Sequence, residues 1–565
     1  MPDAPTGLFG VGWTLVELGR FEEGEALLEE AARKWPDAES PPIGLARAAA
    51  ASGRHRDAHE RWTNLVARFP KSHAVQINLA RSMANLGDWQ GAIQAYEAFV
   101  EGSRTPSTVC TRAEFHAAGY DWPAVVELIG ETDGTSADDV AVHLRRIDLL
   151  NRLAFYTCDP AHLDRAVALA ERLVGRCPHS VRARQALAEA YVTAGRDDDA
   201  ARLIERLPRD PIPSHSFGRL EAWRLSHLGD VEGAKRIWQS LEGNRHATKV
   251  HGPPGDLRQL DGRPVAPAPG EVLLFTVIRN EARRLPWFLS NYRKLGVDRF
   301  IVVDNDSGDG GTDMLLAEPD VHLFHTTGSY ARAWSGMRWI NGLMDLHGAG
   351  HWCLYVDPDE LLVFPGVEES GLARLLDYME SRGHEAFRAF MLDMHGPTSG
   401  YRPDFPPGTD PLPLFPFFDT VHRRFGAVRC PYWQVTGGVR RRDGNVHNLT
   451  KTPIVRGGRG IRFLSSSHQT TPAAVSDVTG VLLHFKLAGA PAEWTDMALG
   501  DRSPGCIRRH RRDSFGDPSG DRDVPLIGAT TVRYESSRQL MALGLIDCPV
   551  DYPVDGPPPG ARHGD

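Results

Sequence analysis

Val272–Glu281 reads VLLFTVIRNE, an almost wholly apolar run that ends in three polar residues. Strands buried on both faces of a sheet have such runs, because neither face meets water. Next along the chain, Pro286–Leu295 begins with a proline, which suits the first turn of a helix, and then spaces its apolar residues at helical intervals. Phe300–Val303 is a second apolar run. This stretch therefore predicts a strand, a helix and a strand in succession.

The same alternation continues to about residue 356. Arg332–Leu346 has the spacing of a helix, and Trp352–Val356 is a third apolar run. An order of β-α-β-α-β predicts a doubly wound parallel sheet, because parallel neighbours need crossover helices.

Polar residues follow each of the three predicted strands. They are Arg279–Glu281, Asp304–Asp306 and Asp357–Glu360. Ligands of open α/β sheets bind at the carboxyl ends of the strands. We therefore expect a ligand site where these three clusters meet.

Asp357 and Asp359 form an Asp-x-Asp pair after the third strand. Mg²⁺ and Mn²⁺ prefer oxygen ligands, and they commonly bind one or two carboxylates together with substrate phosphates. Such a pair also occurs in ordinary acidic turns. The prediction of a metal site therefore depends on the position of the pair directly after the third strand. A phosphatase with an aspartate nucleophile is a weaker interpretation. Such enzymes need the pair immediately after the first strand, with Thr or Val two residues beyond the second Asp. Here the pair follows the third strand, and Glu360-Leu361 comes after it. No glycine-rich dinucleotide or P-loop motif is present.

Three motifs in this order resemble the glycosyltransferase family 2-like superfamily, in particular a bacterial branch. They are TVIRNE at Thr276–Glu281, IVVDNDSGDGGT at Ile301–Thr312 and LYVDPDE at Leu354–Glu360. The resemblance spans about Val272–Phe364 and continues weakly to about Leu487.

The resemblance implies a GT-A (Rossmann-like) nucleotide-sugar transferase domain. It also implies metal-dependent transfer of a sugar from a nucleotide-diphosphate donor, a UDP-sugar, to a protein or glycan acceptor with inversion, with Mn²⁺ or Mg²⁺ as cofactor. Asp357 and Asp359 match the motif that binds the diphosphate and the metal. Further residues expected in the donor site are Glu281, Asp304, Asn305, Asp306 and Arg332.

Two roles fall later in the chain. Inverting transfer needs a carboxylate that takes the acceptor's proton. Asp393, which follows the apolar run from Phe390, is the predicted base, with Asp419 as the rival. Enzymes of this kind often add a histidine to the metal ligands, and His484 resembles that position, with His468 as the competitor.

Residues 1–250 carry a different pattern, with glycines 34 residues apart at Gly19, Gly53 and Gly87, and again at Gly195 and Gly229. Each glycine can end a helix in the left-handed conformation. A small residue then follows in the next helix. These small residues are Gly24, Ala58, Ala92, Ala200 and Ala234. The period resembles the tetratricopeptide repeat, which implies an all-α solenoid whose groove binds a protein partner. A spacer or a dimerisation arm is the alternative.

The remaining segments complete the expected domain plan. Residues 251–270 are rich in proline and glycine and are expected to form a linker before the transferase domain at 271–500. Residues 501–565 are expected to form a polar tail. A net charge of −9 argues against nucleic acid as the main partner. The sequence shows neither a transmembrane segment nor a signal peptide, so a cytoplasmic location is expected.

A second class of function stays open from the sequence. The chain could be a repeat-based protein-binding scaffold whose transferase domain is inactive. The retained acidic series favours the active enzyme.

Overall fold

The structure is a computed structural model of the 565-residue chain. It describes residues 5–554 except for 18–19, 53, 87, 101, 120, 133–138, 209–214, 243–256, 331–332, 402, 428–432, 444–447, 465 and 487–524. The chain divides into two compact units. Met1–Ala183 forms most of the first, and Arg184–Leu241 belongs with the α/β region in the second. The last helices of the array are therefore grouped with the sheet, whereas the sequence suggested a boundary at residue 250.

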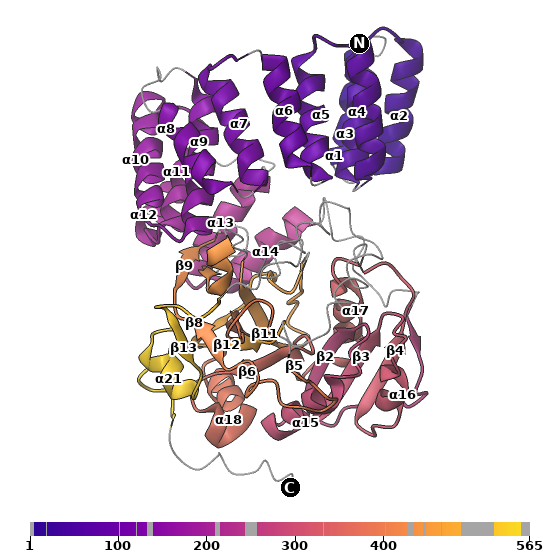
Figure 1. The fold of residues 1–565 in the computed structure, drawn as a ribbon, viewed down its shortest axis with the longest axis vertical. Coiled ribbons are helices and arrows are strands. Elements are labelled where there is room, and N and C mark those ends of the chain that lie inside the picture. Colours follow the sequence, from indigo (N-terminus) through magenta and orange to yellow (C-terminus); the bar gives the residue numbers. More distant parts are fainter. Residues whose placement is uncertain are drawn as a thin grey trace. The chain divides into compact units, whose positions relative to one another are not determined.

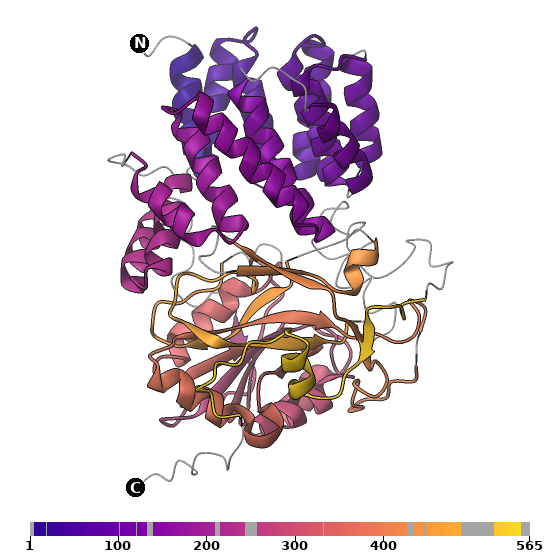
Figure 2. The same cartoon turned by 90° about the vertical axis from the view of Figure 1, so that its left-hand side faces the viewer.

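The first unit is built from helices that run as antiparallel pairs packed side by side (Figure 1, Figure 2). They are α1 (Pro5–Glu17), α2 (Phe21–Lys34), α3 (Ser40–Ala51), α4 (His55–Arg68), α5 (His73–Asn85), α6 (Trp89–Val100), α7 (Pro106–Ala118), α8 (Trp122–Glu131), α9 (Val140–Thr157) and α10 (Ala161–Arg176). The array continues with α11 (Val181–Thr193), α12 (Asp197–Glu205), α13 (His215–His227) and α14 (Val231–Glu242). The helical hairpin is thus the repeated element of the array.

The 34-residue period is visible in the core of the helices. The predicted small residues Ala58 and Ala92 are fully buried. Trp62 and Tyr96, which also lie one period apart, are buried beside them. Gly195 has a φ of +73°, the left-handed conformation expected where one helix ends and the next begins. The glycines predicted at 19, 53 and 87 lie outside the described residues.

The second unit contains one nine-stranded sheet among its described residues, in the order β1-β4-β3-β2-β5-β11-β7-β12-β6. The strands are β1 (Arg258–Gln259), β2 (Val272–Ile278), β3 (Arg299–Asp304), β4 (Val321–His325), β5 (Trp352–Tyr355), β6 (Glu360–Val363), β7 (Ala386–Asp393), β11 (Thr450–Arg456) and β12 (Val475–His484). The three predicted strands β3, β2 and β5 are mutually parallel, as expected, and β4, which was not predicted, is parallel to β3. However, β11 is antiparallel to both neighbours, and β12 is antiparallel to β6. The sheet is mixed, so the prediction of a parallel sheet is wrong beyond β5.

Two hydrophobic clusters cover the two faces of the sheet. Leu274 and Phe300 pack in one cluster, with side chains of α15 (Leu285–Leu295) and α18 (Val367–Ser381). Leu273 and Ile301 pack in the other, with α17 (Met337–His347). Side chains alternate between faces along a strand, so apolar residues at every position bury both faces. A shorter helix, α16 (Gly311–Leu316), follows β3.

The helix predicted to begin at Arg332 begins later, at Met337. Trp334 and Ser335 have φ values of 55°, and Gly336 has a φ of 79°. This left-handed backbone cannot continue a right-handed helix, which explains the late start.

Residues near the carboxyl terminus of the chain are part of the fold. β13 (Thr531–Arg533) pairs with β8 (Phe417–Asp419), and α21 (Ser537–Ala542) follows it. Leu540, Ile546 and Tyr552 are buried in the main cluster. Residues 525–554 are therefore not the polar tail that the sequence suggested. Likewise, β1 lies within the expected linker and pairs with β4.

A short hairpin of β9 (His422–Gly426) and β10 (Trp433–Gly437) leads into a 3₁₀ helix, η2 (Val439–Asp443). This segment brings Arg440 close to the end of β7. Within the described ranges, no helix is both long and apolar enough to cross a bilayer.

Candidate active site

The loop after β3 is ordered by its own acidic residue. Asp304 ends β3 and is buried. One carboxylate oxygen accepts a hydrogen bond from the Ser307 backbone N–H at 3.0 Å, and the other accepts from the Thr312 hydroxyl at 2.8 Å. Asn305 donates to the carbonyl oxygens of Thr326 and Gly328 at 3.1 and 2.9 Å. These two predicted donor-site residues therefore hold the loop's shape.

A second loop, after β2, is tied to the first. The Asn280 backbone N–H donates to the Ser307 hydroxyl at 2.9 Å, and the Asn280 side chain accepts from the Gly308 N–H at 2.8 Å. Asn280 and Asp306 have φ values of 58° and 63°, within the left-handed region that asparagine and aspartate tolerate better than most residues. The two loops form one framework at the carboxyl ends of β2 and β3.

The other predicted donor-site residues have different surroundings. Glu281 is buried and forms an ion pair with Arg284. Asp306 is exposed, with a carboxylate oxygen 3.5 Å from His325 Nε2. Arg332 lies outside the described residues.

The Asp357–Glu360 segment forms a tight turn between β5 and β6, in which the Glu360 N–H donates to the Asp357 carbonyl oxygen at 3.0 Å. Lys451, a buried residue of β11, donates from Nζ to the carboxylates of both Asp357 and Glu360. Tyr355 donates its hydroxyl hydrogen to the other Asp357 oxygen at 3.1 Å. The carboxylate of Asp357 is thus held from two sides.

Asp359, the second residue of the Asp-x-Asp pair, faces His484 instead. The Nε2 atom of His484 lies 3.4 Å from an Asp359 carboxylate oxygen. On the other side of the ring, His484 Nδ1 donates to Asp393 at 2.7 Å. Arg440 forms a two-point ion pair with the same Asp393 carboxylate, at 2.6 and 2.7 Å. The order of groups is Asp359, His484, Asp393 and Arg440.

Sheet register explains how residues so distant in sequence meet. His484, the last residue of β12, is paired in register with Asp393 of β7 and with Glu360 of β6. Paired residues on adjacent strands project to the same face of a sheet. Asp359, Glu360 and His484 each offer one ligand atom, and these three atoms lie within 4.8 Å of one another.

The charges in the cluster shift one another's pKa values. Burial opposes charge on Asp393, but Arg440 and His484 more than offset this and hold the pKa of Asp393 far below its usual value. Burial also lowers the pKa of His484, yet the neighbouring Asp359 and Asp393 raise it to about 9. Burial raises the pKa of Glu360 to about 7 in spite of Lys451.

These contacts argue against Asp393 as the base. It is only 3% exposed, both of its oxygens accept charged hydrogen bonds, and its low pKa makes it a poor proton acceptor. Asp419, the rival, is also buried, and it accepts from the Val421 N–H and the Thr530 hydroxyl, both at 2.9 Å. The geometry favours a positioning role for Asp393 and a structural role for Asp419.

The second histidine considered from the sequence has a structural partner. His468 Nδ1 donates to the Thr450 carbonyl oxygen at 2.8 Å. Burial, together with Lys451, lowers the pKa of His468 to about 3. It is not among the clustered ligand atoms, so the geometry favours His484.

Three residues of the cluster were not predicted: Glu360 as a ligand, Lys451 and Arg440. Lys451 had a weak signal, as a cation near the start of a strand. Arg440 lies in the basic run Arg440–Arg442, and runs of like charge usually lie on a solvated face. Its actual partner, Asp393, lies 47 residues earlier in the sequence.

Comparison with known proteins identifies the helical part of the chain. Models of the tetratricopeptide repeat match residues 43–106 and 162–211. The N-terminal array is a tetratricopeptide-like solenoid. Both matches lie before Val272, so they do not describe the sheet that carries the acidic cluster.

Solved structures similar to this chain include a tetratricopeptide repeat protein from Parabacteroides merdae, at 16% identity. The alignment covers 44% of this chain and 95% of that one, with a TM-score of 0.30. The human IFIT1 dimer with PPP-AAAA is 15% identical over 43% of this chain and 59% of that chain, with a TM-score of 0.31. No match is found among curated proteins.

Proposed function

We propose that the α/β unit is a metal-dependent glycosyltransferase with a GT-A-like fold. It would move a sugar from a nucleotide-diphosphate donor, a UDP-sugar, to a protein or glycan acceptor with inversion. The convergence of Asp359, Glu360 and His484 beside the Asp357 turn carries this proposal. Carboxylate and imidazole ligands at the ends of the sheet strands suit an ion that binds a diphosphate.

The cluster suits Mn²⁺ or Mg²⁺ in its chemistry. Metal-ligating histidines almost always donate their other ring N–H to a carboxylate or a carbonyl group. His484 donates Nδ1–H to Asp393, and its Nε2 faces Asp359. Nε2 would become the ligand atom when the ion displaces its proton. Asp359, His484 and Glu360 would hold the ion, and the ion would neutralise charge on the departing diphosphate. This set differs from the sequence prediction, because Glu360 and not Asp357 lies with Asp359 and His484 among the clustered ligand atoms.

The protein residues around this cluster have separable tasks. Arg440 and Asp393 fix the ring of His484. Asp304 and Asn305 brace the loop at the carboxyl end of β3, where we place the nucleoside. Lys451 offsets the charge of Asp357 and Glu360, so the acids stay close together without a bound ligand.

A donor panel tests the proposal directly. The full chain is incubated with UDP-glucose, UDP-galactose, UDP-N-acetylglucosamine and GDP-mannose, with Mn²⁺ or with excess chelator. Mass spectrometry then measures hydrolysis of each donor. We expect release of UDP from one donor with Mn²⁺, its loss in chelator, and its loss in Asp359→Ala. Asp345→Ala, a change at a half-exposed surface ion pair, should retain activity. Full activity of Asp359→Ala or in chelator would contradict the metal mechanism.

A scaffold with an inactive transferase domain is the second candidate. The tetratricopeptide repeats support a role in protein interaction, and Lys451 already pairs with Glu360, one of the acids that would hold the metal. Calorimetry with Mn²⁺ and UDP separates the candidates. Binding of either without turnover of any donor in the panel would favour the scaffold.

A further inference from the structure

A small group of polar side chains lies where the turn between β8 and β9 meets the 3₁₀ helix η2. The Gly438 N–H, just before η2, donates to the Val421 carbonyl oxygen of that turn at 2.8 Å. Arg441 of η2 lies 3.8 Å from a carboxylate oxygen of the buried Asp419. The members of this group, called the η2 subsite, are Asp419, His422 and Arg441.

The η2 subsite adjoins the candidate active site. Arg440, the residue before Arg441, forms the two-point ion pair with Asp393 at the end of β7. The charge of Asp393 also acts on the ring of His422, together with the charges of Asp419 and Arg441. The subsite is therefore next to the Asp393 end of the acidic cluster.

His422 is a polar side chain whose hydrogen-bonding atoms are not used. It is half-buried, and both of its ring nitrogens are buried without a hydrogen-bond partner in the part of the chain that the structure describes. Burial lowers the pKa of His422 to about 4, so at neutral pH the ring has one N–H donor and one acceptor nitrogen. A buried polar atom without a partner costs about 1–3 kcal/mol. The ring therefore favours a ligand that can both donate and accept.

A glycine leaves one edge of the His422 ring uncovered. Gly438 has a φ of 67°, and a Cβ atom at this position would lie 2.9 Å from His422 Nε2. Any larger residue would thus place its side chain where a hydrogen-bond partner of Nε2 belongs. The left-handed backbone and this close approach both require glycine here.

Arg441 contributes a further donor to the subsite. Among the described residues, its buried Nε–H has no partner, and its Nη2 atom is too far from Asp419, at 3.8 Å, for a hydrogen bond. The charges are nevertheless balanced, since Arg441 lies beside Asp419, Arg440 binds Asp393 and His422 is neutral. A charged ligand would disturb this balance, whereas neutral hydroxyl groups would not.

We propose that the η2 subsite binds a neutral sugar residue of the acceptor glycan, through hydroxyl groups that bond to His422 and Arg441. A sugar carries several adjacent hydroxyls, each of which donates and accepts, and the subsite offers three uncommitted atoms. The single hydroxyl of a serine or threonine could not meet all three. The geometry therefore favours a glycan over a protein acceptor. Calling this sugar the acceptor rests on the proposed function, but its binding does not.

Saturation-transfer NMR with the full chain tests the proposal, without a donor and in excess chelator. The probes are maltotetraose, cellotetraose, mannotetraose and chitotetraose, compared with tetragalacturonic acid and with the peptide Gly-Ser-Thr-Ser-Gly. We expect saturation transfer to at least one neutral tetrasaccharide, and none to the acidic sugar or the peptide. Because no turnover is measured, failure of the transferase proposal would leave this result unchanged.

Two variants place the bound sugar at the η2 subsite. His422→Leu and Arg441→Leu should each weaken binding of the responding tetrasaccharide at least tenfold in an NMR titration. Arg423→Gln is the matched control, because neighbouring residues of a strand project to opposite faces, and it should leave affinity within about twofold. Without sugar, His422→Leu should melt at the parental temperature or above it by circular dichroism, since it removes two unpartnered nitrogens.

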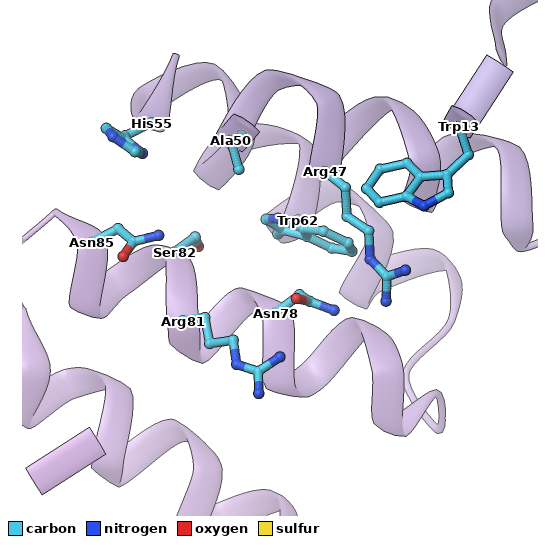
Figure 3. A pocket seen from close by; sticks show the side chains of 10 residues that line it. Trp13, Arg47, Ala50, His55, Trp62, Asn78, Arg81, Ser82 and Asn85 are labelled. Atoms are coloured by element: carbon cyan, nitrogen blue, oxygen red, sulfur yellow. The ribbon is translucent and has the colours of Figure 1, made fainter. Parts of the chain in front are cut away.

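A further control addresses another polar opening in the chain. Figure 3 shows Asn78 and Asn85 at a pocket of about 220 Å³ among the first helices of the solenoid. Asparagine amides can also bond to sugar hydroxyls, so Asn78→Ala asks whether the sugar binds there, and it should keep the parental affinity. The proposal would be overturned if no neutral tetrasaccharide bound, if the acidic sugar or the peptide bound better, or if His422→Leu retained binding. Loss of binding in Asn78→Ala, or a lower melting temperature of His422→Leu, would also overturn it.

Discussion

Asp393→Asn distinguishes two roles for the same residue. The sequence suggested a base, whereas the structure places Asp393 between Arg440 and His484. Asparagine keeps the shape of the side chain but removes its charge. If Asp393 were an exposed base, the substitution would spare the fold and slow only the chemistry.

The structure predicts a larger effect on stability. Arg440 is 6% exposed, so the substitution leaves a buried guanidinium without its counter-charge. Breaking a buried ion pair by removal of one partner costs about 3–5 kcal/mol. Loss of the carboxylate that orients a metal-binding histidine typically lowers metal affinity about 10–100-fold. We therefore expect weaker Mn²⁺ binding and a lower free energy of unfolding.

Urea denaturation followed by tryptophan fluorescence measures the free energy of unfolding, and calorimetric titration measures the affinity for Mn²⁺. Asp345→Asn is the matched control. Asp345 also forms a two-point ion pair, with Arg462 at 2.7 and 2.8 Å, but it is 40% exposed. Such surface pairs contribute about 0–1 kcal/mol, so the control should stay close to the parent in both assays.

The reasoning would be refuted by a particular pattern of results. Asp393→Asn would have the stability and Mn²⁺ affinity of the parent, while donor turnover fell roughly 10²–10⁴-fold. That pattern describes a base that accepts a proton from the acceptor. It would also mean that the ion pair with Arg440 contributes nothing to the fold.

Three further predictions concern other parts of the chain. Trp62→Ala should lower the free energy of unfolding of the solenoid by about 3–5 kcal/mol in urea denaturation, because it empties a buried site, and an unchanged midpoint would contradict this. His468 has a pKa of about 3 in the folded chain and about 6.5 in the unfolded chain, so below pH 6.5 the unfolded chain binds the proton more readily. The free energy of unfolding should therefore fall by at most roughly 1.4 kcal/mol for each pH unit. His468→Gln should flatten this decline between pH 6.5 and 4, and an identical pH profile would count against it. The fragment Arg184–Asp565 should melt at a higher temperature than Gly270–Asp565, because only the longer one keeps the ion pair of Lys235 with Glu385; equal melting temperatures would oppose this.

Local patterns in the sequence predicted the elements that are regular. The 34-residue period predicted the solenoid, which the repeat models confirm. Continuous apolar runs predicted β2, β3 and β5, because strands buried on both faces have no polar positions. The strand Val321–His325 was missed, since its two histidines interrupt the apolar run. Strand direction in β11 and β12 depends on long-range pairing, which local periodicity does not encode.

In the site, too, local features could be predicted from the sequence and long-range contacts could not. The acidic residues after the strands were found because each follows a recognisable local element. The partners of these acidic residues were not found, because they lie far away in the sequence. Lys451, for example, is 94 residues from Asp357. Asp393 was placed correctly at a strand end, but its role depends on Arg440. The roles of Asp359 and His484 at a metal stay predictions, although the structure brings these two residues together.

The in-register alignment of Glu360, His484 and Asp393 across β6, β12 and β7 has a practical consequence for handling the protein. If β12 slipped by one residue, the imidazole would turn to the opposite face of the sheet, and the ligand group would no longer assemble. Under the proposed function, the average number of Mn²⁺ ions bound per chain would then report the fraction of molecules in which β7, β12 and β6 paired correctly. A preparation refolded from denaturant could be graded by metal stoichiometry alone, before any donor or acceptor is known.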